Sequence, residues 1–261
     1  MNTMITIKGN TVFRSGEEHI LGPAGPDTSA PGYIGGYESL GALRAGGYLA
    51  AQNRKLQVAD KFWKTDENRQ GGIFLKLRVL DDITVDSEQE FSYLRQGFSL
   101  AWITLSDKGA KGQRVDESGP LIEEVAGSSL EISLAAGFII PDDPVLLKSL
   151  MVHLALTSGF DLVITTGGTG LGPRDITPEV TMDIIDKRLP GFEQAMLNYS
   201  LTKTPHAVIS RAVAGTLGLS LVINLPGSPG GVRENLEVVL PALGHALKKL
   251  QGDQSDCAAK V

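Results

Sequence analysis

The segment from Asp161 to Glu179 reads DLVITTGGTGLGPRDITPE, and it indicates the fold of the second part of the chain. Its start, Asp161–Thr166, is mostly apolar and β-branched, which is typical of a buried strand. A glycine-rich loop follows, and a helical pattern then runs from Pro178 to Lys187. A strand, a glycine loop and a helix in this order predict an α/β domain, with the loop at the carboxyl edge of its sheet.

The same alternation continues on both sides of this segment. Strands are expected at Phe98–Leu105, Leu130–Ile140 and Leu219–Leu225, and helices at Glu117–Ala126, Val145–Leu156, Gly191–Leu201 and Val232–Leu250. Asp143 is expected to cap the helix that begins at Pro144, and Gly159 to close it. Pro241 is expected to kink the last helix or to split it in two. We therefore predict an α/β domain over residues 96–251, with a mostly parallel central sheet flanked by helices.

Residues 1–95 have a different pattern. Glycines and prolines concentrate between Gly22 and Gly47, and only short β-like pieces occur, at Thr3–Lys8, Lys55–Ala59 and Gly72–Val85. These features predict a small β-rich N-terminal domain, whose role the sequence does not indicate. Residues 252–261 are polar and are expected to form a flexible tail.

Composition narrows the classes of function. The chain has 261 residues, 42% of them hydrophobic, which is enough for a substantial core. Its net charge is -6 and its 24 basic residues are scattered, so we expect small ligands and no nucleic acid. The single cysteine, Cys257, rules out an intramolecular disulfide and a metal–thiolate site. Without a signal pattern or a membrane span of ~18 apolar residues, the expected location is cytoplasmic.

The glycine loop is the first candidate for ligand binding. Gly167, Gly168, Thr169 and Gly170 would let the backbone approach a ligand and direct N–H groups at an anion. The loop lacks the lysine of a phosphate-binding Walker loop, and its glycine spacing differs from the dinucleotide fingerprint. The alternative interpretation is a tight turn that needs positive φ angles.

Asp142 and Asp175 are the second candidate. Both follow predicted strands, so in a parallel sheet both would lie at the carboxyl edge. Two carboxylates beside a triphosphate suggest Mg²⁺, because hard divalent cations take oxygen ligands and bridge phosphates. The alternatives are a role for Asp142 at the start of the following helix and a role for Asp175 as an N-cap or turn residue.

Two further segments offer groups to an anion. Pro226, Gly227 and Ser228 leave a predicted strand and enter a helix, whose first N–H groups suit a phosphate. Ser210 and Arg211 offer a hydroxyl and a guanidinium. A plain turn and a solvated arginine are the alternatives. The histidines, at positions 19, 153, 206 and 245, have no metal-binding spacing.

Several ordered motifs between Phe98 and Leu250 resemble the molybdopterin adenylyltransferase family of molybdenum-cofactor biosynthesis, which includes bacterial proteins and the G domains of plant and animal homologues. The motifs are TLSD at 104–107, DESGP at 116–120, IPDDP at 140–144, TTGGTGLGPRDITP at 165–178, LPGF at 189–192, SRA at 210–212 and NLPGSP at 224–229. One such motif would be weak, whereas so many in the same order are specific.

The resemblance implies a reaction and a site. The reaction is transfer of AMP from ATP to the terminal phosphate of molybdopterin, with release of pyrophosphate and with Mg²⁺ as the required ion. Asp142 and Asp175 match the aspartates associated with activity, and Gly167–Gly170 match the substrate-binding loop. The remaining matched pocket positions are Ser106, Asp116, Ser118, Ser210, Arg211, Pro226, Gly227 and Ser228. The resemblance also implies a homotrimer.

Two other functions remain open at this stage. A related domain occurs in the enzymes that insert molybdenum in the same pathway. A non-catalytic carrier or scaffold could keep the pocket without the activity. The N-terminal 95 residues could bind another protein of the pathway, cover the pocket or stabilise the assembly.

Overall fold

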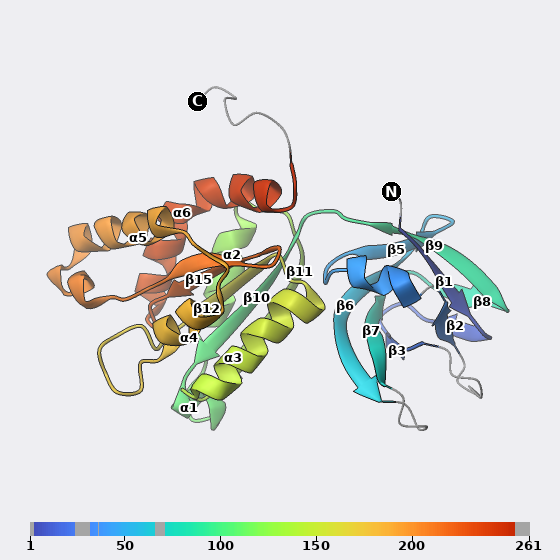
Figure 1. The fold of residues 1–261 in the computed structure, drawn as a ribbon, viewed down its shortest axis with the longest axis horizontal. Coiled ribbons are helices and arrows are strands. Elements are labelled where there is room, and N and C mark those ends of the chain that lie inside the picture. The colour runs from blue at the N-terminus through green and yellow to red at the C-terminus, as the bar shows by residue number, and fades with distance from the viewer. Residues whose placement is uncertain (1–2, 24–31, 36, 66–70, 254–261) are drawn as a thin grey trace. The chain divides into compact units, whose positions relative to one another are not determined.

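The computed structural model describes residues 3–23, 32–35, 37–65 and 71–253 (Figure 1). The chain divides into two compact units. The N-terminal unit comprises Met1–Ser99 with Thr157–Gly159, and the C-terminal unit comprises Leu100–Leu156 with Phe160–Val261.

The N-terminal unit is built on a seven-stranded sheet with the order β3-β7-β6-β5-β9-β1-β4. Its strands are β1 (Met4–Lys8), β3 (Glu18–Leu21), β4 (Tyr33–Gly35), β5 (Tyr48–Ala51), β6 (Arg54–Thr65), β7 (Gly71–Val79) and β9 (Glu88–Leu94). A separate pair joins β2 (Thr11–Phe13) to β8 (Ile83–Val85), and a 3₁₀ helix, η1, spans Tyr37–Ala42. The edge strands meet where the Ile34 N–H donates to the Gly22 carbonyl at 2.8 Å.

The alternation of buried and exposed side chains explains why these segments are strands. In β7 the side chains of Leu75, Leu77 and Val79 are buried in the core of the unit, whereas Arg78 between them is exposed. The predicted β-rich character is confirmed. Two boundaries were wrong: β6 extends well past the predicted Ala59, and the predicted piece Gly72–Val85 is two strands, because β7 and β8 belong to different sheets.

The C-terminal unit has a six-stranded sheet with the order β11-β10-β12-β15-β14-β13. The strands are β10 (Phe98–Leu105), β11 (Ile132–Ile140), β12 (Leu162–Thr166), β13 (Lys187–Arg188), β14 (Ala214–Leu217) and β15 (Ser220–Leu225). β10, β12 and β15 run parallel, whereas β14 and β13 are antiparallel additions. The predicted α/β fold with a mostly parallel sheet is confirmed.

Helices cover both faces of this sheet. They are α1 (Asp107–Ala110), α2 (Ser118–Gly127), α3 (Pro144–Val152), α4 (Thr177–Ile184), α5 (Pro190–Lys203) and α6 (Pro229–Leu250), with a π turn η2 (His153–Ser158) and a 3₁₀ helix η3 (Pro205–Ile209). Figure 1 shows α3 and α4 in front of the sheet, while α2 and α5 pack against α6. Every residue of β12 and β15 is buried, as expected for parallel strands that are covered on both sides.

Most of the predicted helix boundaries agree with the structure. The Asp143 carboxylate caps α3 by accepting from the N–H groups of Val145 (2.9 Å) and Leu146 (3.0 Å), as predicted. The helical segment ends at Ser158, and Gly159 follows with φ +76°, which explains the glycine there.

Pro241 was predicted to kink the last helix or to split it in two. The split does not occur, because α6 is continuous from Pro229 to Leu250 and buries apolar side chains on both sides of the proline, among them Leu236 and Leu243. The predicted extension of α4 to Lys187 is also wrong, because the backbone of Lys187 pairs with Thr216 of β14. Cys257 and the tail beyond Asp253 lie outside the described residues. Over the described part of the chain, no helix is both long enough and apolar enough to cross a membrane.

Candidate active site

Four loops meet at the carboxyl edge of the six-stranded sheet. They follow β11, β10, β12 and β15, which are consecutive neighbours in the sheet. The Ser106 N–H donates to the Ile140 carbonyl at 2.9 Å, and the Gly167 N–H donates to the Leu225 carbonyl at 3.2 Å. These backbone bonds bring together segments that are widely separated in the sequence, and all the predicted site residues lie on or beside these loops.

The glycine loop after β12 is built on two residues with positive φ. Gly167 has φ +97° and Gly168 has φ +64°. A Cβ atom on Gly167 would lie 2.7 Å from the Leu105 carbonyl oxygen, so this position also excludes a side chain for lack of space. Thr177 fastens the loop to α4, since its N–H donates to the Gly168 carbonyl (3.1 Å) and its hydroxyl to the Gly167 carbonyl (2.9 Å). The tight-turn interpretation therefore holds for these two glycines.

Asp175 lies against the inside of the same loop. Its Oδ2 accepts from the Gly172 N–H at 2.7 Å, and a Cβ atom on Gly170 would lie 2.8 Å from that oxygen. The N-cap of α4 is Ile176, so the alternative N-cap role of Asp175 is wrong and its turn role is the observed one. Among the described residues, Oδ1 of Asp175 makes no hydrogen bond, which leaves one carboxylate oxygen available for a ligand.

Asp142 lies in a negatively charged environment. Its N–H donates to Oδ1 of Asp107 at 3.3 Å. Burial raises the pKa of the Asp142 carboxyl group, and the nearby carboxylates of Asp107 and Asp175 raise this pKa further, while Arg174 lowers it in part. Arg174 itself donates to both oxygens of Asp107, at 2.6 and 2.7 Å. The site therefore holds three acidic groups from three loops, with one arginine between them.

Asp107 and Arg174 were not predicted as site residues, although both belong to the motifs quoted from the sequence. Oxygen donors of this kind suit a hard cation such as Mg²⁺. Within the described ranges, however, no group of three or more histidine, cysteine, aspartate or glutamate side chains has an arrangement that could hold a metal by itself. Asp142 and Asp175 could therefore supply only part of a coordination shell.

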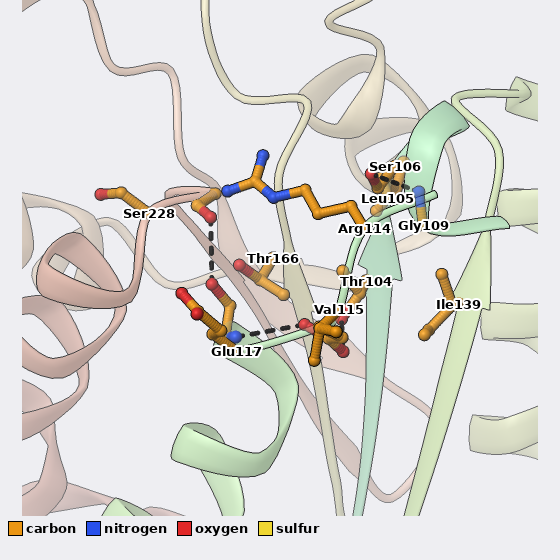
Figure 2. A pocket seen from close by; sticks show the side chains of 13 residues that line it. Thr104, Leu105, Ser106, Gly109, Arg114, Val115, Glu117, Ile139, Thr166 and Ser228 are labelled. Atoms are coloured by element: carbon orange, nitrogen blue, oxygen red, sulfur yellow. Dashed lines mark hydrogen bonds between the residues drawn. The ribbon is translucent and has the colours of Figure 1, made fainter. Parts of the chain in front are cut away.

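A cavity of about 290 Å³ opens beside these loops (Figure 2). It is lined by Thr104, Leu105, Ser106, Gly109, Arg114, Val115, Asp116, Glu117, Ser118, Ile139, Thr166, Gly227 and Ser228. The structure thus brings together five of the predicted pocket residues from three separate motifs. Thr104, Arg114 and Thr166 are lining residues that were not predicted; of these, only the two threonines lie within the quoted motifs.

Most polar side chains of this cavity are used to build its walls. Asp116 accepts from the Thr104 hydroxyl (2.7 Å) and from the N–H groups of Ser118 (3.1 Å) and Gly119 (2.9 Å), so it fixes the start of α2. The Ser118 hydroxyl donates to the Gly227 carbonyl at 3.0 Å. Arg114 makes no hydrogen bond or ion pair with any described residue, and Figure 2 shows its side chain extending to the Ser228 side of the cavity. Arg114 is therefore a cation that an anionic ligand could use.

A second cavity, of about 760 Å³, lies next to the first. The predicted residues Thr169, Gly170, Ser210, Arg211, Pro226 and Ser228 line it, together with residues of α5, η3 and α6. Ser228 lines both cavities, so the two spaces adjoin at the start of α6. Asp142, Asp175, Gly167 and Gly168 are not among the described residues that line either cavity. The arrangement offers two neighbouring binding spaces with an acidic cluster on the same sheet edge.

Comparisons with known proteins agree on this part of the chain. Residues 101–245 match the family described as "probable molybdopterin binding domain". Gephyrin of Dictyostelium discoideum is 36% identical over 170 residues, which cover 62% of this chain but only 24% of gephyrin. The molybdopterin adenylyltransferase of Helicobacter pylori J99 is 39% identical over 159 residues, or 60% of this chain and 90% of that protein. Among solved structures, the molybdopterin biosynthesis enzyme MoaB from Thermus thermophilus has 44% sequence identity to this chain and a TM-score of 0.55. That match covers 60% of this chain and 98% of the MoaB chain.

Proposed function

Since this chain belongs to the family of probable molybdopterin binding domains, we propose that its C-terminal unit is a molybdopterin adenylyltransferase. In the proposed reaction an oxygen of the terminal phosphate of molybdopterin attacks the α-phosphorus of ATP. A new P–O–P bond forms, the bond between the α- and β-phosphates breaks, and pyrophosphate leaves with the electron pair. The products are adenylylated molybdopterin and pyrophosphate.

The acidic cluster at the sheet edge, beside two adjoining cavities, is the observation that supports this proposal most. A transfer between two phosphate-bearing substrates needs two binding spaces that meet, and the cavities adjoin at Ser228. It needs no covalent nucleophile of the protein, because positioning and charge neutralisation supply most of the rate enhancement.

We assign to Asp142 and Asp175 the role of holding Mg²⁺ and orienting the attacking phosphate. Burial and then the nearby carboxylates of Asp107 and Asp175 raise the pKa of Asp142, and a bound cation would favour the ionised carboxylate. Two carboxylates suffice for this ion, since Mg²⁺ is usually held by one or two carboxylates together with substrate phosphates and water. When bound, it would neutralise charge on the triphosphate and on the leaving pyrophosphate.

The remaining site residues receive supporting roles. In the glycine loop Gly167–Gly170, the backbone of Gly168, Thr169 and Gly170 would hold an anionic part of the substrate, while the Gly167 N–H donates to the Leu225 carbonyl. Ser106, Ser118, Ser210, Pro226, Gly227 and Ser228 would shape the two binding spaces, while Asp116 holds the wall of the first. Arg114 would attract a phosphate group, because its guanidinium has no partner among the described residues and lines the first cavity. A homotrimeric state and a cytoplasmic location belong to the same proposal.

Pyrophosphate release from ATP, molybdopterin and Mg²⁺ by the full chain tests the proposal. We expect release that depends on both substrates and that falls by about two orders of magnitude in Asp142→Asn, as is typical when one charged group of a site is removed. Asp143→Asn is the matched control, because asparagine caps a helix as well as aspartate and the change is one residue away. Metal transfer from preformed adenylylated cofactor without pyrophosphate release would indicate molybdenum insertion instead. Tight pterin binding with no turnover of ATP would indicate a carrier.

A further inference from the structure

The sequence led us to expect that Arg211 offers its guanidinium to an anionic ligand. We propose that Arg211, neutralised by Glu179, is a positioning residue that braces the glycine loop, and that it does not bind substrate through its charge. This inference rests on the proposed function only for its catalytic consequence, since the bracing itself is a property of the free protein.

The contacts of Arg211 span the loop from one side to the other. Its backbone N–H donates to the Thr169 carbonyl at 3.1 Å. In the side chain, Nε donates to the Gly170 carbonyl at 2.8 Å and one terminal nitrogen to the Asp175 carbonyl at 2.9 Å. The other terminal nitrogen forms an ion pair with the carboxylate of Glu179, on the first turn of α4. All three nitrogens of the guanidinium are thus engaged within the protein.

The segment between the two braced carbonyls has one other side-chain anchor, the exposed ion pair that Arg174 forms with Asp107. Residues 171–174 are exposed, and the Leu171 side chain is 67% exposed, so apolar burial contributes little there. Within the loop, the Gly172 N–H donates to Asp175, and the Asp175 N–H donates in turn to the Gly172 carbonyl at 2.9 Å. These bonds shape the turn but do not fasten it to the rest of the unit. Arg211 fastens it at Gly170 and at Asp175.

Charge also favours bracing over substrate binding. Glu179 already compensates the guanidinium, and breaking this pair to contact a phosphate would leave a carboxylate beside an anionic substrate. Arginine suits the bracing role because its planar guanidinium donates in three fixed directions. A lysine has the same charge but a single nitrogen, so it could not reach the Gly170 carbonyl, the Asp175 carbonyl and Glu179 together.

The brace has a specific consequence for Asp175. Its carbonyl is bonded to Arg211 while its carboxylate faces Gly170 and Gly172, so loss of the brace would let the proposed catalytic carboxylate move with the loop. A displacement of about 1 Å at a reacting group can cost ~100-fold in rate. Binding of ATP, which we propose to occur in the two adjoining cavities, should change less.

Arg211→Lys and Glu179→Gln test the inference, with Glu237→Gln as the control because Glu237 forms an ion pair with Arg233 on the exposed side of α6. In both test variants we expect faster amide hydrogen exchange across residues 168–176, with exchange in α6 unchanged. We also expect kcat to fall at least ~10-fold while KM for ATP changes less than ~3-fold. The control should match the wild type in both measurements.

Three results would overturn the proposal. A rise of KM for ATP in Arg211→Lys at unchanged kcat would place Arg211 in substrate binding, and so would tighter ATP binding in Glu179→Gln, where the guanidinium loses its partner. Unchanged exchange at residues 168–176 would show that the loop does not depend on Arg211. The exchange measurement needs no turnover, so it separates failure of this inference from failure of the proposed activity.

Discussion

Replacing Gly167 with alanine should destabilise the C-terminal unit, because both the backbone conformation and the space at this position exclude a side chain. The residue has φ +97°, a conformation that an alanine adopts only at a cost of about 1–3 kcal/mol. The new Cβ atom would also lie 2.7 Å from the Leu105 carbonyl oxygen, at the end of β10, and relieving such overpacking costs about 1–3 kcal/mol more. Because the neighbour is backbone, it cannot rotate away. We therefore expect a loss of about 2–6 kcal/mol in the free energy of unfolding.

Urea unfolding followed by tryptophan fluorescence measures this loss. The chain has two tryptophans, Trp63 in β6 and Trp102 in β10, so a Trp63→Phe background leaves Trp102 as the reporter for the C-terminal unit. Gly191→Ala is the matched control. Gly191 lies within α5 and has open space around its position. The Gly191→Ala variant should therefore gain about 0.4–1 kcal/mol in the free energy of unfolding.

If the free energy of unfolding of Gly167→Ala lies within ~0.5 kcal/mol of that of its parent, a difference ordinary for a surface substitution, then position 167 does not require glycine. If both glycine variants lose the same free energy, the loss comes from alanine itself and not from the loop geometry.

Three further outcomes are expected. Asp142→Asn should raise the free energy of unfolding at neutral pH while it lowers activity, because the folded-state pKa of Asp142 lies above its usual value of 3.8 and the folded protein therefore disfavours the ionised carboxylate. This gain in the free energy of unfolding should disappear as the pH falls through the folded-state pKa. A stability difference that does not depend on pH would contradict the prediction. Asp116→Asn should cost about 1–3 kcal/mol in urea unfolding, because three donors depend on the Asp116 carboxylate, and an unchanged midpoint would show that they find other acceptors. Ser228→Ala removes the N-cap of α6, whose hydroxyl oxygen accepts from the Gly231 N–H at 3.2 Å, and should cost ~1 kcal/mol in the same assay; a loss above ~2 kcal/mol would point to a further role.

Local patterns were sufficient for the elements that carry the site. The apolar run Phe98–Leu105 is a strand, and the sequence Asp143-Pro144 begins a helix with the predicted cap. These features depend on residues that are neighbours in the chain, such as a carboxylate within reach of the N–H groups two and three positions later. The placement of the four site loops at one edge also followed from the alternation of strands and helices, because parallel strands present their carboxyl ends together.

The pairing of strands that are distant in the chain could not be predicted from the sequence. In the N-terminal unit β5 pairs with β9, so that Leu49 lies opposite Tyr93, and no local pattern selects that partner over another strand. The same holds for β13 and β14 in the C-terminal unit, where Lys187 pairs with Thr216 and ends a helical pattern early. The physical reason is that strand register is fixed by tertiary burial and not by the period of a single strand.

The sequence by itself determined that this chain contains an α/β unit with a glycine loop and two aspartates at its sheet edge, because each of these features is written in contiguous residues. Only the tertiary structure decided what the charged groups around that loop do. It placed Asp107 beside Asp142, left Arg114 without a partner among the described residues, and engaged Arg211 with two carbonyls that are 41 and 36 positions away. A guanidinium in the sequence can bind a ligand or hold a loop, and the acceptors within its reach determine which.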